Sequence, residues 1–132
     1  MTDVVYDAAV LIAADRNERS VWADHKVRLE NGVVPLVPAA VVAQVSRSSR
    51  QAQLRRFLRG CTVVPLVESS AHAVGRLLSA ARTADIVDAS VVTIAVSRRA
   101  SIVTGDPDDI EHLVRAAGGG VSRRRTSSGP RT

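Results

Sequence analysis

Residues 4–14 read VVYDAAVLIAA, a short strand pattern followed at once by a helix pattern. Val4, Val5 and Tyr6 favour a buried strand, because β-branched and aromatic residues fit a pleated sheet. The small, mostly apolar residues after Asp7 favour a helix over 8–14. A strand that leads directly into a helix is typical of an α/β domain with a parallel sheet.

The rest of the chain repeats this alternation, and the helix at 85–98 is apolar on nearly all sides, which indicates burial. We expect an α/β fold with three layers, α/β/α, around a central, mostly parallel sheet of four to five strands. The predicted domain covers residues 1–120. Its strands are predicted at 3–6, 33–37, 61–66 and 101–104, and its other helices at 18–30, 39–46, 50–59, 69–81 and 106–117.

The net charge of +5 is concentrated at one end of the chain. All 13 acidic residues lie at or before Glu111, and four of the 18 basic residues lie in the last twelve positions. Subtracting these four leaves 14 basic against 13 acidic residues in 1–120, a net charge of +1. We therefore expect residues 121–132 to form a basic, disordered tail beside a nearly neutral domain.

Several classes of protein are disfavoured by the composition. A single cysteine, Cys61, excludes an internal disulfide framework and a multi-thiolate metal site. The longest apolar stretch, 86–96, contains polar residues, and Asp3 lies where a signal peptide carries bases. We expect a cytoplasmic protein without a membrane segment. The histidines share no metal-ligand spacing and are expected at surface or packing positions: His25, His72 and His112.

Two aspartates follow directly on predicted strands, Asp7 after 3–6 and Asp106 after 101–104. Because ligands bind at the carboxyl ends of parallel strands, both carboxylates are expected in one crevice. Asp7 stands between a buried strand and an Ala-rich helix, where packing gives no reason for an acid. Asp106 with Pro107 also fits a helix start, a role that is compatible with metal binding.

A third candidate, Asp88, lies in the buried helix, where an ionised carboxylate is costly unless a cation meets it. Asp85, three residues earlier, fits a helix N-cap better than a ligand. Carboxylates from distant parts of the chain, without thiols or paired histidines, indicate a site for Mg²⁺, with Mn²⁺ as a substitute. Hydrolysis of phosphodiesters is the chemistry that needs such a site.

These motifs, in this order, resemble the PIN-domain family, and in particular the VapC-type ribonuclease toxins of toxin–antitoxin pairs. The resemblance implies that Asp7 and Asp88 bind Mg²⁺, that Asp106 completes the cluster directly or through water, and that Asp109 supports it. It also implies an antitoxin and a second copy of the chain as partners. The quoted motifs are Val5-Tyr6-Asp7-Ala8, Pro38-Ala39-Ala40-Val41, Asp88-Ala89 and Thr104-Gly105-Asp106.

One position departs from the family, because Gln44 stands where the family usually places a glutamate. Glutamine keeps an acceptor oxygen but loses the charge, which weakens metal binding. Two functions follow as alternatives. The first is an Mg²⁺-dependent endoribonuclease toxin that leaves a 3′-hydroxyl and a 5′-phosphate. The second is a catalytically silent PIN-fold module that binds antitoxin or RNA. A phospho-accepting receiver domain is disfavoured, because Asp7 has no adjacent acid.

Two groups of arginines are considered for RNA binding. The first, Arg47, Arg50 and Arg55, lies in a basic segment and could contact RNA phosphates, although a solvated helix face is about as consistent with the pattern. The second is the terminal run 123–125. It either adds non-specific affinity for RNA or is inert, and the inert tail is the favoured interpretation.

Overall fold

The computed structural model describes residues 3–105, 107–120 and 123–125. Strands and helices alternate through this part of the chain, as predicted. The strands are β1 (Val4–Tyr6), β2 (Leu36–Pro38), β3 (Thr62–Val64), β4 (Ser101–Thr104) and β5 (Arg123–Arg125). The helices are α1 (Ala8–Asp15), α2 (Arg19–Glu30), α3 (Ala39–Val45), α4 (Ala52–Arg59), α5 (Glu68–Ala81), α6 (Ile86–Arg98) and α7 (Asp108–Ala116).

The strands form one parallel sheet in the order β3-β2-β1-β4-β5. β1 is the central strand, and Val5 is aligned with Leu36 of β2 on one side and Ile102 of β4 on the other. All three residues of β1 are buried, as are all four residues of β4. A strand buried on both faces explains the uninterrupted apolar run at 4–6.

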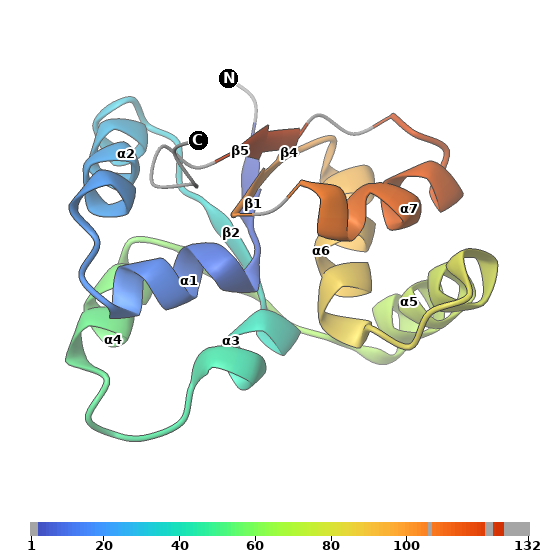
Figure 1. The fold of residues 1–132 in the computed structure, drawn as a ribbon, viewed down its shortest axis with the longest axis horizontal. Coiled ribbons are helices and arrows are strands. Elements are labelled where there is room, and N and C mark those ends of the chain that lie inside the picture. The colour runs from blue at the N-terminus through green and yellow to red at the C-terminus, as the bar shows by residue number, and fades with distance from the viewer. Residues whose placement is uncertain (1–2, 106, 121–122, 126–132) are drawn as a thin grey trace.

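Helices cover both faces of the sheet, so the three-layer architecture is confirmed (Figure 1). α1, α2 and α4 lie on one side, and α5, α6 and α7 lie on the other. α6 packs against β1, β2 and β4, and buries Ala89, Val91, Val92 and Ala95, as its sequence predicts. In the described ranges, no helix is long and apolar enough to cross a bilayer.

The expectation of a disordered tail is wrong for three residues, because Arg123–Arg125 form β5 beside β4. The physical reason is that strand pairing uses backbone groups, and β4 would otherwise leave its outer N–H and C=O groups unpaired. Charged residues are common on such edge strands, where they oppose further pairing with other chains. The remaining tail positions, 121–122 and 126–132, lie outside the described residues.

Candidate active site

Asp7 lies at the junction between β1 and α1, at the carboxyl end of the central strand. Its backbone is extended, and its carboxylate accepts a hydrogen bond of 3.2 Å from the Val10 N–H. The side chain is therefore the N-cap of α1. The sequence-based argument that Asp7 has no structural role is therefore wrong.

The electrostatic surroundings of Asp7 do not fully compensate its charge. The residue is only 6% exposed, and this burial raises the pKa of its carboxyl above the usual 3.8. Hydrogen bonds from the Thr104 hydroxyl and from the N–H groups of Ala9, Val10 and Gly105 act in the opposite direction. Within the described part of the chain, no arginine or lysine forms an ion pair with Asp7. A buried carboxylate whose negative charge is not compensated by a neighbouring cation is suited to bind a metal ion.

Two neighbours of Asp7 were not identified from the sequence. Thr104 ends β4 and is fully buried, and its hydroxyl bonds to the Asp7 carboxylate. Gly105 follows, and a Cβ at this position would lie 2.7 Å from the Ala9 Cβ. The turn after β4 therefore packs directly on the first turn of α1. The sequence feature that could have identified them is the placement of a hydroxyl residue and a glycine at the end of a buried strand, directly before Asp106.

Asp88 is the third residue of α6 and is half-buried. α6 ends next to the beginning of β4, because the Ala100 N–H bonds to the Ala95 carbonyl and β4 starts at Ser101. The helix therefore runs opposite to the strands, and its first turn lies toward their carboxyl ends (Figure 1). This places Asp88 at the same edge of the sheet as Asp7.

Asp85 is confirmed as the N-cap of α6, since its carboxylate accepts a hydrogen bond of 3.0 Å from the Asp88 N–H. Asp106 lies outside the described residues, as does the side chain of Asp109. α7 begins at Asp108, preceded by Pro107 in a helical conformation. Among the residues that the structure does describe, no three acidic, histidine or cysteine side chains form a group that could bind a metal.

The predicted accessory residues lie on and after α3. Gln44 is exposed on this helix, which begins at the end of β2. Arg47, Arg50 and Arg55 are exposed as well. The Arg47 guanidinium donates to the Ala43 and Ser46 carbonyls at 3.0 Å, and that of Arg55 donates to the Ser48 and Ser49 carbonyls. These two arginines therefore brace their own loop.

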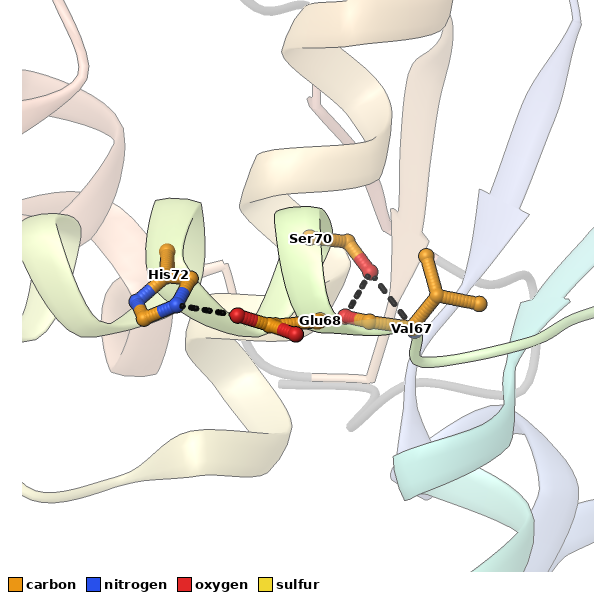
Figure 2. A network of polar contacts seen from close by, with 4 residues as sticks. All are labelled: Val67, Glu68, Ser70 and His72. Atoms are coloured by element: carbon orange, nitrogen blue, oxygen red, sulfur yellow. Dashed lines mark hydrogen bonds and ion pairs between the residues drawn. The ribbon is translucent and has the colours of Figure 1, made fainter.

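The histidines occupy packing or surface positions. His25 is 3% exposed, and one of its ring nitrogens is 2.9 Å from the Tyr6 hydroxyl. His72 lies on the surface of α5, 3.2 Å from Glu68 (Figure 2). At the start of the same helix, the Ser70 hydroxyl accepts from the Val67 N–H and donates to the Val67 carbonyl (Figure 2). These contacts stabilise α5 and bring no further acid to Asp7.

The fold is similar to two solved structures. One is VapBC2 from Rickettsia felis bound to a DNA fragment from their promoter, with a TM-score of 0.73 and 14% identity, covering 94% of this chain and 98% of that chain. The other is PAE2754 from Pyrobaculum aerophilum, with a TM-score of 0.61 and 16% identity, covering 92% and 90%. No protein-family model and no curated protein sequence matches this chain. The likenesses confirm the expected PIN-like fold.

Proposed function

We propose that this protein is an Mg²⁺-dependent endoribonuclease, the toxin of a toxin–antitoxin pair. The observation that carries the proposal is Asp7, a buried carboxylate whose burial outweighs its hydrogen bonds. It follows the central strand directly, and Asp88 lies in the first turn of α6 at the same edge of the sheet. Two carboxylates at one edge of the sheet, supplied by distant segments of the chain, favour a hard divalent cation.

The donor set fits Mg²⁺ or Mn²⁺, because its members are carboxylates and one of them lacks a compensating cation. Asp7 and Asp88 would hold the ion, and Asp106 would complete the site. When bound, the ion supplies Lewis-acid activation of water and neutralises charge on the phosphodiester. Asp109 and Gln44 support this site in the proposal, Gln44 through its acceptor oxygen.

The protein's own residues perform the positioning. Thr104 and Gly105 hydrogen-bond to the Asp7 carboxylate, which fixes its orientation before a ligand arrives. Val10 N–H holds the same group at the start of α1, where the helix dipole favours negative charge. In this proposal the leaving 3′-oxygen takes its proton from water, and the products carry a 3′-hydroxyl and a 5′-phosphate.

An antitoxin and a second copy of the chain are the proposed protein partners. The similarity to VapBC2 supports the antitoxin. Exposed apolar side chains support association with another protein surface: Leu66 and Val67 before α5, and Ile86 and Val96 on α6 are 44–52% exposed. Because the RNA substrate is intracellular, the proposal places the activity in the cytoplasm. The mass of the purified protein by light scattering tests the dimer.

Cleavage of RNA by the purified protein tests the function. A labelled, structured RNA should be cut in Mg²⁺ or Mn²⁺ and should remain intact when EDTA is added. The Gln44→Glu variant separates this proposal from the silent module. Activity in the parent protein supports the enzyme, whereas activity that appears only in Gln44→Glu supports a silent parent. Cleavage that persists in EDTA contradicts a metal-dependent nuclease.

A further inference from the structure

We infer that β5 is a binding strand for the phosphate backbone of the RNA substrate, an inference that rests on the proposed ribonuclease function. β5 consists of three consecutive arginines at the edge of the sheet. Its residues are in register with the last three residues of β4: Ile102 with Arg123, Val103 with Arg124, and Thr104 with Arg125. The strand therefore ends level with the residue that hydrogen-bonds to Asp7.

This register places the arginine strand near the candidate metal site. Adjacent strands are about 4.8 Å apart, so β5 is about 10 Å from the strand that ends in Asp7. An RNA strand that presents one phosphodiester to Asp7 has further phosphates along its backbone within reach of such a strand. Arginine suits this contact, because its planar guanidinium binds phosphate oxygens in pairs.

The neighbouring strand brings no charged residue into register with β5. Its register partners on β4 are Ile102, Val103 and Thr104, none of which is charged. Arg124 is exposed, and within the described residues it forms no ion pair with an acid. Residues 1–120 carry a net charge of only +1, so a polyanionic ligand depends on local groups of cations.

Four of the other arginines already contact the protein. Arg47 and Arg55 donate to carbonyls of their own loop, and Arg56 lies 4.4 Å above the Trp22 ring. Arg28 bonds to the Tyr6 hydroxyl at 3.2 Å. Three adjacent arginines in register with the end of β4 are therefore better placed to bind RNA than Arg47 and Arg55. The alternative role of β5 is protection of the sheet edge against aggregation, which predicts no effect on RNA.

The test compares R123Q/R124Q/R125Q with the parent protein in binding a fluorescein-labelled single-stranded RNA. EDTA is present, so that binding is measured without cleavage, and the KCl concentration is varied. Single-stranded contacts contribute about 0.7 each to the slope of log affinity against log salt. Successive residues of a strand point to opposite faces, so one RNA strand meets one or two of the three arginines, and the variant's slope should be smaller by about 0.7 to 1.4. Its affinity at 100 mM KCl should fall about tenfold or more.

Two matched variants control this experiment. R19Q/R76Q/R98Q removes the same charge from exposed positions on α2, α5 and α6, and should change the affinity less than about twofold. R123K/R124K/R125K keeps the charge and should retain most of the binding. If R123Q/R124Q/R125Q fails to fold by circular dichroism, R124Q is compared with R123Q/R125Q, which changes the opposite face of the strand, and one of the two should lower the slope by about 0.7 or more.

The results separate this inference from the proposed function. Equal slopes and affinities for the β5 variant and the R19Q/R76Q/R98Q control would overturn the binding strand, even if the parent cleaves RNA. A parent that binds RNA through β5 but never cleaves it would support the strand and contradict the enzyme. A DNA of the same sequence forms the second arm, and a loss restricted to DNA would overturn the assignment to RNA.

Discussion

Replacing Asp7 by asparagine should make the metal-free protein progressively more stable than the parent as the pH rises. Burial raises the pKa of the Asp7 carboxyl above its usual 3.8, so the folded state retains this proton more readily than the unfolded chain. The parent's stability from this group is complete below 3.8, and is lost as the pH rises through the raised pKa. Asparagine does not ionise and keeps an N-cap oxygen for α1.

The magnitude follows from linkage. Between the unfolded and the folded pKa, the free energy of unfolding of Asp7→Asn relative to the parent should rise by about 1.4 kcal/mol per pH unit, and then reach a plateau. Asp7→Ala should show the same pH dependence. Its free energy of unfolding should be lower than that of Asp7→Asn by about 1 kcal/mol at every pH, because alanine cannot accept the capping hydrogen bond from the Val10 N–H. This second variant separates the cap from the charge.

Urea unfolding in EDTA at several values between pH 4 and 7.5 measures these differences. Repeating the series with Mg²⁺ should stabilise the parent, by about 2.7 kcal/mol at 100 times the dissociation constant, and leave Asp7→Asn unchanged. If the difference in unfolding free energy between Asp7→Asn and the parent does not depend on pH, the inference that the charge of Asp7 is uncompensated is refuted. A relative stability of Asp7→Asn that falls with pH would show that the fold favours the charged form.

Two further predictions concern the buried residue His25, which contacts Tyr6, and its neighbour Gly60. Burial lowers the pKa of His25 from 6.5 to about 4, so the parent should lose about 3 kcal/mol of stability from this group as the pH falls from 6.5 to 4. His25→Phe should lack that loss in urea titrations, and equal acid sensitivity would contradict it. Gly60→Ala should cost about 1 kcal/mol or more in thermal unfolding, because its Cβ would lie 2.9 Å from His25 Nε2. Gly75→Ala, with no neighbour within 4 Å, should instead gain about 0.5–1 kcal/mol, and the same sign for both would be inconsistent with this packing.

The alternation of strands and helices was predictable from local patterns, because buried strands such as β4 require uninterrupted apolar runs. β4 occurs at the predicted residues, 101–104. β5 was not predictable in this way, since three arginines have no apolar pattern and no favourable strand propensity. The strand forms because the backbone of β4 offers an unpaired edge, which is a property of the assembled sheet.

The candidate site was predictable in its acids but not in their environment. The position of Asp7 after a buried strand identified it, and the topology brings it to the same edge as Asp88. Its capping bond to Val10 was missed, because apolar neighbours suggested that an acid had no local role. The bond from Thr104 was also missed, because it joins residues almost a hundred positions apart. Such contacts depend on the strand order.

The rate of RNA cleavage by Asp88→Asn, compared with Asp85→Asn, tests the central claim most directly. Both changes remove one charge within the same helical turn, and asparagine at position 85 keeps the N-cap of α6. If Asp88 holds the catalytic ion, the cleavage rate of Asp88→Asn should be lower than that of the parent by about 100-fold or more. The reason is that a metal contributes several kcal/mol to the stability of the transition state. Asp85→Asn should stay within about threefold of the parent. Cleavage by Asp88→Asn at the parent's rate would contradict the account.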